Sequence, residues 1–272
     1  NIIRNIMKRR RNMIPYDTKV LAFDLDGTLT QHKSPLSSEY KQLLTQLKTR
    51  YTLLMVGAGS CARIFSQMRR FPIEIIGNYG MQYARAKEMG DRIKLELCRD
   101  DRAEVDVPLA IRRADELRKK LGYTSFEGDT LEIHESGMLT FPILGTQAPI
   151  QDKLSYDPDR SKRRAVYTQV VEMFPEYKVY IGGSSSFDIV PHPYAKLYAL
   201  DLYCAGFGLK HEEILYFGDD YGIGGNDEDV FLSDIPFQCI DDYRTIPRYL
   251  IPLLTDDRTG EEKRYELESI GK

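Results

Sequence analysis

Short apolar runs alternate with amphipathic segments over the first third of the chain, and this alternation most strongly constrains the fold. The runs span residues 19–25, 51–58 and 73–80. They are rich in branched and aromatic residues, and each closes with Gly or Asp. Between the first two, apolar residues recur at helical spacing after Ser37 or Ser38, either of which is a suitable helix N-cap. Buried parallel strands have this pattern, so we predict a doubly wound α/β sheet that binds ligands at the carboxyl ends of its strands.

The middle of the chain has a different pattern, in which helical and strand-like segments are segregated. Helical spacing occupies 108–122 and 160–174, whereas strand-like patterns occupy 129–144 and 177–182. Such segregation is typical of an α+β domain, here a small antiparallel sheet with helices on one face. The α/β pattern resumes from residue 187. We therefore predict a core domain that is interrupted in sequence by an inserted cap.

This organisation predicts four parts. They are a basic N-terminal extension at 1–15, the first part of the core at 16–85, the α+β cap at 86–186 and the second part of the core at 187–272. A chain of 272 residues with 42% hydrophobic residues is long and apolar enough for a core plus a smaller domain. The extension has no long apolar segment and no small-residue cleavage site, so we expect it to be solvated.

Charge and cysteine content exclude several classes of partner. The formal net charge of -3 gives no field that would attract nucleic acid, and no apolar run is long enough to cross a bilayer. The four cysteines are scattered without a C-x-x-C spacing, which is typical of reduced thiols in an intracellular protein. We expect a cytoplasmic protein that binds neither nucleic acid nor membranes.

Four polar clusters follow the predicted strands or begin a helix of the core. They are residues 24–28 (Asp-Leu-Asp-Gly-Thr), residues 57–60 (Gly-Ala-Gly-Ser), Lys196, and a loop with Asp219, Asp220 and Asp227. Several carboxylates and one lysine in a single crevice suit Mg²⁺, which prefers hard oxygen ligands and usually shares its shell with a phosphate. A metal ion and a lysine would also offset the repulsion between Asp24 and Asp26.

Each cluster also has an ordinary explanation. The first is not a calcium-binding EF-hand loop, because Leu29 and Pro35 stand where that loop needs Gly and Glu. Residues 57–60 and the segment 224–227 are each typical of a tight turn, and a single lysine at a helix start is usually exposed to solvent. Their order and spacing together favour a catalytic site.

These motifs give the chain a resemblance to a known superfamily. From Val20 to about Phe237 it resembles the haloacid dehalogenase superfamily, and within it the eukaryotic-type phosphomannomutases and related sugar-phosphatases with an α/β cap of subclass IIB. The motifs are "FDLDGTLT", "VGAGS", "GNYGMQ", "GML", "GGSSSFDIVPHPYAK" and "YFGDDYGIGGNDEDVF". The last two are the most specific, whereas the first marks the superfamily alone.

The resemblance implies a division of roles at the site. Asp24 would be the nucleophile that forms an aspartyl-phosphate, and Asp26 the general acid and then the base. Lys196 would neutralise the transferring phosphoryl group. Asp219 would hold Mg²⁺ together with Asp24 and the backbone carbonyl of Asp26. Further candidate ligands of the metal are Asp220 and Asp227.

Two departures from the family pattern concern substrate binding. The superfamily usually has a hydroxyl at the end of the second strand, where this chain has Gly57, and Ser60 is the candidate substitute. In the cap, the positions of arginines that grip the distal phosphate of a hexose bisphosphate hold Glu135, Thr146 and Lys153. A glutamate repels phosphate, and a lysine lacks the bidentate fork of arginine.

The sugar-contacting positions of the cap, by contrast, are kept. Ser186 and Asp188 match them. The resemblance therefore implies a sugar-like substrate that differs from a hexose bisphosphate at the end that would carry the distal phosphate. Weak retention of a bisphosphate intermediate would favour release and hydrolysis. The cap would open and close over the site. The family also implies that two copies can pair through their caps.

Three functions remain open. The leading prediction is a Mg²⁺-dependent phosphohydrolase for a sugar phosphate or a similar small phosphate ester. The nearest alternative is a phosphomannomutase whose cap uses other basic residues, among them Lys153, Arg160 and Arg163. A non-catalytic sugar-phosphate-binding protein is the third, and the intact Asp24, Lys196 and Asp219 disfavour it.

Two groups of basic residues in the cap are predicted to be solvated helix faces rather than a phosphate or nucleic-acid site. The first group is balanced by Asp115 and Glu116. The groups are Arg112, Arg113, Arg118, Lys119 and Lys120, and Arg160, Lys162, Arg163 and Arg164.

Overall fold

The computed structural model describes residues 13–14, 17–90, 92–255 and 265–266. The chain divides into two compact units. The first unit comprises residues 1–99, 196–221 and 229–272, and the second comprises residues 100–195 and 222–228.

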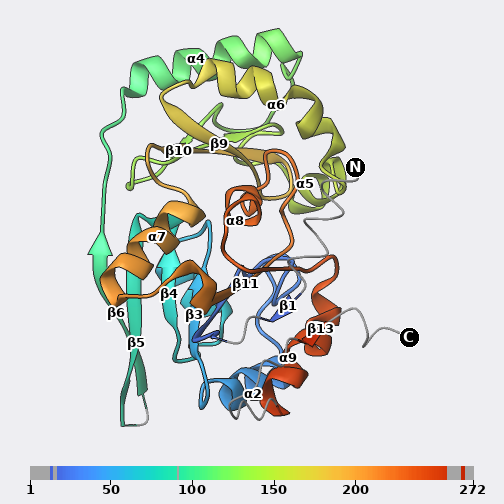
Figure 1. The fold of residues 1–272 in the computed structure, drawn as a ribbon. Coiled ribbons are helices and arrows are strands. Elements are labelled where there is room, and N and C mark those ends of the chain that lie inside the picture. Colours follow the sequence, from blue (N-terminus) through green and yellow to red (C-terminus); the bar gives the residue numbers. More distant parts are fainter. Residues whose placement is uncertain (1–12, 15–16, 91, 256–264, 267–272) are drawn as a thin grey trace. The chain divides into compact units, whose positions relative to one another are not determined.

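The first unit is built on a seven-stranded sheet with the order β12-β11-β2-β3-β4-β5-β6 (Figure 1). Its strands are β2 (Val20–Phe23), β3 (Thr52–Val56), β4 (Glu74–Gly77), β5 (Gln82–Met89), β6 (Arg92–Asp100), β11 (Ile214–Gly218) and β12 (Phe237–Cys239). The neighbours from β12 to β4 are parallel, whereas β5 joins β4 in the antiparallel direction. The predicted α/β class with a doubly wound, largely parallel sheet is confirmed.

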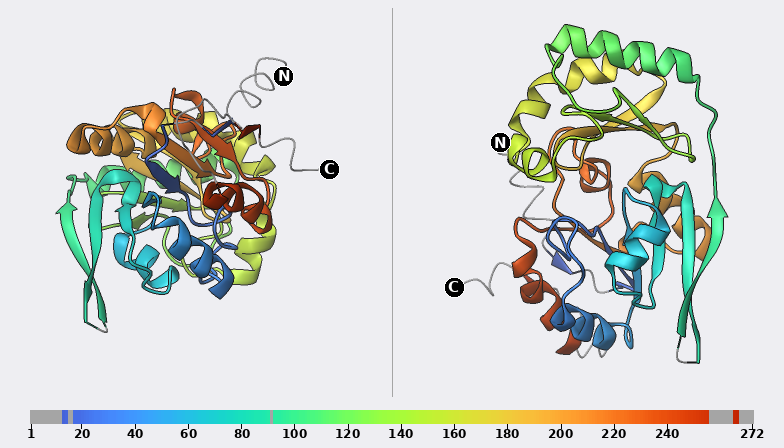
Figure 2. Two further views of the ribbon diagram at one scale, coloured as in Figure 1. Left: turned by 60° about the horizontal axis from the view of Figure 1, so that its bottom comes forward. Right: turned by 180° about the vertical axis from the view of Figure 1, so that it is seen from behind.

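Helices cover both faces of this sheet (Figure 2). Side chains of successive strand residues point to opposite faces, so apolar strands such as these have apolar side chains on both faces for helices to cover. On one face, α2 (Ser38–Leu47), α3 (Cys61–Gln67) and α9 (Pro247–Thr255) pack in one apolar cluster. On the other face, α7 (Lys196–Phe207) and α8 (Glu228–Leu232) belong to a second cluster. Ser37 caps α2, since its hydroxyl accepts a hydrogen bond from the backbone N–H of Tyr40 at 3.1 Å.

The second unit is a four-stranded antiparallel sheet with helices on one face. The strand order is β7-β8-β10-β9, from β7 (Glu132–Ile133), β8 (Leu139–Pro142), β10 (Ser186–Pro191) and β9 (Tyr177–Gly182). Helices α4 (Val107–Leu121) and α6 (Ser161–Met173) share an apolar cluster with strands β8, β9 and β10. The right-hand view of Figure 2 shows both helices on the same side of this sheet. A third helix, α5 (Ile150–Tyr156), lies between the predicted strand-like segment 129–144 and the predicted helical segment 160–174.

The boundaries between the units differ from the predicted ones. Residues 86–99 belong to the first unit rather than to a cap, because β5 and β6 extend the large sheet in hydrogen-bonded pairing. Residues 187–195 belong to the second unit rather than to the core, because β10 pairs with β8 and β9. Hydrogen-bonded pairing, which the local pattern does not specify, decides both boundaries.

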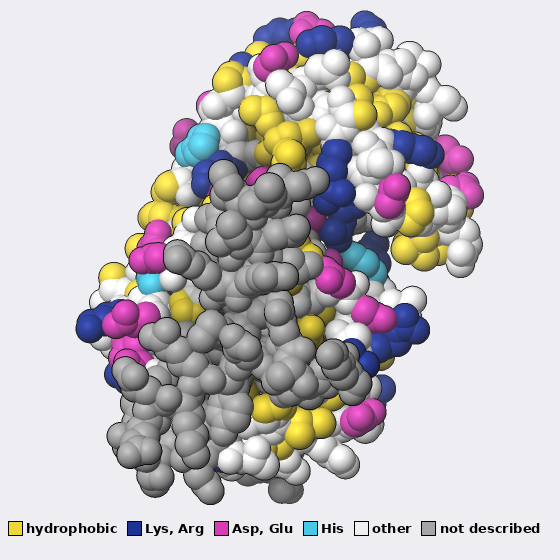
Figure 3. All heavy atoms as spheres, turned by 45° about the vertical axis from the view of Figure 1, so that its right-hand side comes forward, with side chains coloured by type: hydrophobic (Ala, Val, Ile, Leu, Met, Phe, Trp, Pro, Cys, Tyr) yellow, Lys and Arg dark blue, Asp and Glu magenta, His cyan; other side chains and the backbone are white. Residues whose placement is uncertain are grey.

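Smaller elements complete the described chain. Strand β1 (Met13–Ile14) pairs antiparallel with β13 (Tyr265–Glu266), so part of the expected N-terminal extension forms a short ladder with the second part of the predicted core. The rest of the extension lies outside the described residues. Short 3₁₀ helices span Asn78–Gly80, His211–Glu213 and Tyr243–Thr245. Among the described residues, no helix is long and apolar enough to span a membrane. On the face in Figure 3, acidic and basic side chains are interspersed.

The sheet topology brings two acidic strand ends together. From β2 the chain proceeds outward through β3 and β4, whereas β11 and β12 lie on the other side of β2. The strand order therefore reverses between β2 and β11, which is where open α/β sheets bind their ligands. Phe23 is in register with Phe217, so Asp24 and Asp219 follow directly on neighbouring strands.

Phe217→Ala should reduce the free energy of unfolding by about 3–5 kcal/mol, because Phe217 is fully buried in β11 and stacks on Phe23 with ring centroids 4.8 Å apart. Chemical denaturation followed by circular dichroism measures the loss. The matched control is Phe207→Ala, whose ring is 45% exposed, and which should cost less than about 1 kcal/mol. Equal losses in the two variants would contradict this account of the core.

Candidate active site

A buried ion pair joins the end of β2 to the start of α7. Asp24 follows β2 and is 5% exposed, while Lys196 is the first residue of α7 and has no exposed surface. The Lys196 ammonium Nζ donates to Asp24 Oδ1 at 2.7 Å. Burying either charge alone would be costly, so each side chain stabilises the other in this position. The structure thus brings the predicted nucleophile and the predicted lysine into direct contact.

Asp219, at the end of β11, lies against the turn that follows Asp26. The hydroxyl of Thr28 donates to Asp219 Oδ1 at 3.2 Å. A Cβ atom on Gly27 would lie only 2.5 Å from Asp219 Oδ2, and Gly27 has a φ of +95°. Glycine is therefore required at position 27 both for the backbone conformation and for the approach of the Asp219 carboxylate.

The carboxylates of Asp24 and Asp219 fit a magnesium ion. Each offers an oxygen atom within 4.8 Å of the other, and carboxylate oxygens are the hard ligands that Mg²⁺ prefers. Asp220 is buried beside Asp219 in the first unit. Asp227 is fully buried and belongs to the segment 222–228 of the second unit. Metal binding by these carboxylates stays a prediction.

Asp26 has a different set of partners. Its carboxylate accepts hydrogen bonds from Gln67 Nε2 at 2.6 Å, from the backbone N–H of Lys33 at 2.8 Å and from Arg63 Nη1 at 3.3 Å. Burial acts to raise the pKa of Asp26, but these hydrogen bonds and the positive charge of Arg63 outweigh burial and lower the pKa below its ordinary value. The surroundings therefore favour the carboxylate, the form that accepts a proton.

Arg63 and Gln67 are site residues that the sequence motifs did not indicate. Both lie on α3, four residues apart and so on one face of the helix, and Arg63 Nη1 also donates to Gln67 Oε1 at 2.9 Å. The guanidinium of Arg63 lies over Gly59, where a Cβ atom would be 2.2 Å from Nε. The one available signal was this i, i+4 pair directly after the Gly-Ala-Gly-Ser turn.

The turn after β3 has clear structural roles. A Cβ atom on Gly57 would lie 2.8 Å from the Ile64 side chain, so glycine allows α3 to pack closely. Ser60 is the N-cap of α3, and its hydroxyl accepts from the backbone N–H of Arg63 at 3.2 Å. Substrate binding by Gly57 and Ser60 stays a prediction.

Ser186 and Asp188 lie on β10, on the face of the second sheet opposite to α4 and α6. Asp188 is in register with Thr140 and Tyr180, whereas the neighbouring Phe187 is fully buried in the apolar cluster. The hydroxyl of Ser186 donates to the carbonyl of Gly182 at 3.0 Å. The structure thus brings both predicted sugar-contacting residues to one polar face.

Glu135, Thr146 and Lys153, which the resemblance places at arginine positions of the family, have partners within the second unit. Lys153 Nζ donates to the backbone carbonyl of Thr146 at 2.8 Å, and the Thr146 hydroxyl accepts from the backbone N–H of Asp129 at 2.9 Å. Glu135 is exposed and lies 3.7 Å from Arg102. The ammonium group of Lys153 is therefore engaged by its own chain, and its role as a substrate ligand stays a prediction.

Gly27→Ala should displace the Asp219 carboxylate and lower the affinity for Mg²⁺ at least tenfold, because the new methyl group would overlap that carboxylate. The measurement is the Mg²⁺-dependent rise in melting temperature, or isothermal titration with Mg²⁺. The matched control is Gly206→Ala in α7, where nothing lies within 4 Å of the added Cβ. It should keep the Mg²⁺ response and stabilise the helix by about 0.5–1 kcal/mol. An unchanged Mg²⁺ response in Gly27→Ala would contradict the prediction.

Comparison with known proteins connects this geometry to a family. A family model described as "Eukaryotic phosphomannomutase" matches residues 40–240. A phosphomannomutase of Drosophila melanogaster is 26% identical over 227 residues, which are 79% of this chain and 87% of the relative. A phosphomannomutase of Saccharomyces cerevisiae is 26% identical over 228 residues, which are 80% of this chain and 86% of the relative.

Solved structures support the fold. The IMP-bound, N-terminally truncated IMP-nucleotidase of Plasmodium falciparum matches with a TM-score of 0.60 at 10% identity, over 89% of this chain and 69% of that chain. The ATP-bound IMP-nucleotidase of the same organism matches with a TM-score of 0.65 at 10% identity, over 91% of this chain and 63% of that chain. The family match covers most of the chain and confirms the resemblance to enzymes of the haloacid dehalogenase superfamily. The chain belongs to the eukaryotic phosphomannomutase family.

Proposed function

We propose that the protein is a Mg²⁺-dependent phosphomutase that moves a phosphoryl group between two hydroxyls of a hexose phosphate. The observation that carries the proposal is the buried contact of Lys196 with Asp24 at 2.7 Å, at the strand end that Asp219 also approaches. A carboxylate held beside a fixed positive charge suits attack on a phosphoryl group, since the charge that builds up on phosphate oxygens is stabilised as it forms. Family membership supports this choice of reaction.

The residues divide the reaction into two transfers. An oxygen of Asp24 bonds to phosphorus while the bond from phosphorus to the sugar oxygen breaks, and Asp26 gives the departing oxygen a proton. In the second transfer, Asp26 takes a proton from a sugar hydroxyl, whose oxygen then bonds to phosphorus while the bond to Asp24 breaks. The ionised state that the Asp26 environment favours suits this second role. Lys196 neutralises charge on the phosphoryl group in both transfers.

Mg²⁺ would be held by Asp24 and Asp219, with Asp220 and Asp227 as further candidate ligands. When bound, it would neutralise negative charge on the transferring phosphoryl group. In the second unit, Ser186 and Asp188 are the proposed contacts for sugar hydroxyls. The cytoplasmic location and the pairing of two copies through the second unit stay predictions.

A phosphohydrolase is the second candidate function, in which water replaces the second hydroxyl. It was the leading prediction from the sequence, but the family and the curated relatives favour the mutase. One observation still favours hydrolysis. Glu135, Thr146 and Lys153 stand at the three arginine positions, and the Lys153 ammonium is bound to the Thr146 carbonyl. A weaker grip on a bisphosphate would let the intermediate leave before the sugar turns over.

The test is incubation with Mg²⁺ and a panel of hexose 1- and 6-phosphates, in which sugar-phosphate isomers and free phosphate are followed together. Interconversion that a trace of hexose bisphosphate stimulates is the expected result. Release of free phosphate without interconversion of the isomers would show that the protein is a phosphohydrolase and not a mutase. Absence of both would contradict phosphotransfer on hexose phosphates.

Asp24→Asn should lower either activity by at least about 10³-fold, because the amide cannot form the phosphorylated intermediate. The measurement is the initial rate on the best substrate of the panel. Asp17→Asn is the matched control at an exposed position, and it should keep the wild-type rate. If Asp24→Asn keeps more than a tenth of the rate, Asp24 is not the nucleophile.

A further inference from the structure

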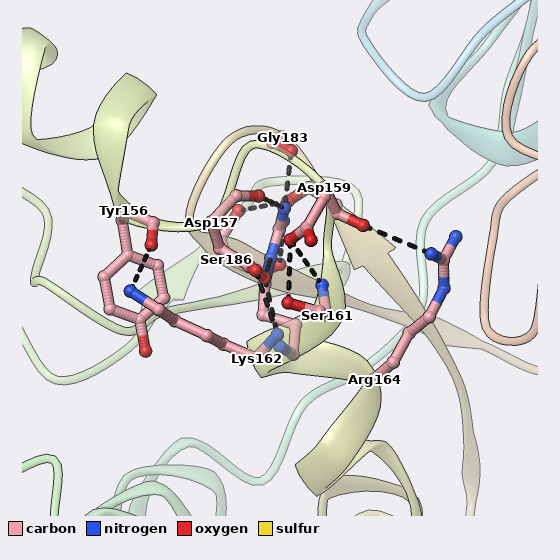
Figure 4. Close-up of polar contacts among 10 residues, drawn as sticks. Tyr156, Asp157, Asp159, Ser161, Lys162, Arg164, Gly183 and Ser186 are labelled. Carbon is pink, nitrogen blue, oxygen red and sulfur yellow. Dashed lines mark hydrogen bonds and ion pairs between the residues drawn. The ribbon is translucent and has the colours of Figure 1, made fainter. Parts of the chain in front are cut away.

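Arg163 lies inside the second unit rather than on a solvated helix face or at a phosphate. It is the third residue of α6, and only 1% of its surface is exposed. Asp157, which precedes the helix, is equally buried at 1%. Figure 4 shows its two neighbours on the helix, of which Lys162 extends to the backbone carbonyl of Tyr156 and Arg164 extends away from Asp157 to the carbonyl of Asp159.

On one side, Arg163 is held by Asp157. Its Nε donates to Asp157 Oδ2 at 2.8 Å, and its Nη2 donates to the Asp157 backbone carbonyl at 3.2 Å. The Asp157 carboxylate also accepts the backbone N–H groups of Lys162 at 2.9 Å and of Arg163 at 3.0 Å. These groups belong to the first turn of α6, so the carboxylate both caps the helix and orients the guanidinium.

On the other side, Arg163 holds the turn between β9 and β10. Its Nη1 donates to the backbone carbonyls of Gly182 at 2.7 Å, Gly183 at 3.1 Å and Ser186 at 3.3 Å. Three carbonyl oxygens that converge on one point repel one another unless a cation lies between them. The conformation of this turn therefore depends on the guanidinium.

The same turn sets the positions of the two proposed sugar contacts. The carbonyl of Gly182 accepts from the Ser186 hydroxyl at 3.0 Å as well as from Arg163. The Asp188 carboxylate lies directly over the Cα atom of Gly182, where an added Cβ would be 2.3 Å from Oδ1. A shift of Gly182 would consequently move both Ser186 and Asp188.

We propose that Arg163 is a positioning residue, which fixes the β9–β10 turn and thereby aims Ser186 and Asp188 at the hydroxyls of the substrate. The inference rests on the proposed function, because a hexose phosphate is the ligand whose hydroxyls these residues would meet. Lysine cannot replace arginine here, since one ammonium group does not reach Asp157 and the three carbonyls in the fixed geometry of a guanidinium fork. The predicted alternative, in which Arg163 contacts a phosphate directly, is disfavoured by its burial and its occupied nitrogens.

The test compares four proteins on two substrates. Arg163→Met combined with Asp157→Asn removes both charges, so no unpaired charge stays buried, and the Asn oxygen still accepts a backbone N–H of α6. Arg163→Lys is the conservative variant. Arg113→Met is the control, because Arg113 is another arginine of the second unit, and its ion pair with Glu176 joins α4 to the start of β9. The fourth protein is the wild type.

The two substrates are the best hexose phosphate and phenyl phosphate, which has no sugar hydroxyls. In the double variant, we expect KM for the hexose phosphate to rise at least tenfold, with phenyl phosphate hydrolysis within twofold of the wild type. Arg163→Lys should show an intermediate rise, and Arg113→Met none. Hydrogen exchange, measured by mass spectrometry, should be faster at residues 183–188 of the double variant and unchanged in α4.

Other outcomes overturn the inference. An unchanged KM for the hexose phosphate, or an equal loss on both substrates, would show that Arg163 does not act through the sugar contacts. Unchanged exchange at 183–188 would show that it does not hold the turn. If the wild type acts on phenyl phosphate but on none of the hexose phosphates, the proposed function itself fails, and this inference fails with it. If the wild type acts on the hexose phosphate and the double variant has the same KM, the positioning role of Arg163 is refuted while the proposed function stands.

Discussion

The buried contact between Lys196 and Asp24 is the interaction on which the candidate site depends. The two residues are 172 positions apart in sequence, and neither side chain has appreciable contact with solvent. Such a pair is stable only where the surrounding fold brings the charges together and excludes water. The sheet does this at the point where its strand order reverses, and the register of β2 with β11 adds Asp219 to the same strand ends.

Glycines make room for the charged groups in both units. The Asp219 carboxylate lies against Gly27, the Arg63 guanidinium against Gly59 and the Asp188 carboxylate against Gly182. In each case an added Cβ atom would lie 2.5 Å or less from a charged group, so any other residue would push that group away. Glycine is useful here chiefly because it lacks a side chain, and only Gly27 of the three also needs a positive φ.

The two units differ in how far they keep the family pattern. In the first unit, Asp24, Lys196 and Asp219, to which the resemblance assigns phosphoryl transfer, are all present, and both Lys196 and Asp219 lie close to Asp24. In the second unit, Ser186 and Asp188 stand at the predicted sugar-contacting positions, and Arg163, paired with Asp157, donates to the carbonyls of the turn beside them. Where the resemblance expects arginines for a second phosphate, this chain has Glu135, Thr146 and Lys153. A mutase and a hydrolase would share the phosphorylated intermediate and differ in whether a sugar hydroxyl or water receives its phosphoryl group.

Local patterns in the sequence determined the α/β class, the strands around Asp24 and Asp219, a helix cap at Ser37 or Ser38 and the start of a helix near Lys196. Strand alternation, helical spacing and caps all act within a few residues. Tertiary structure alone decided which sheet β10 joins, since an apolar run pairs equally well with either. It also decided that Arg163 is buried and that Arg63 reaches Asp26. A charge pattern along a helix does not specify which distant group a side chain will meet, because that contact depends on how separate elements pack.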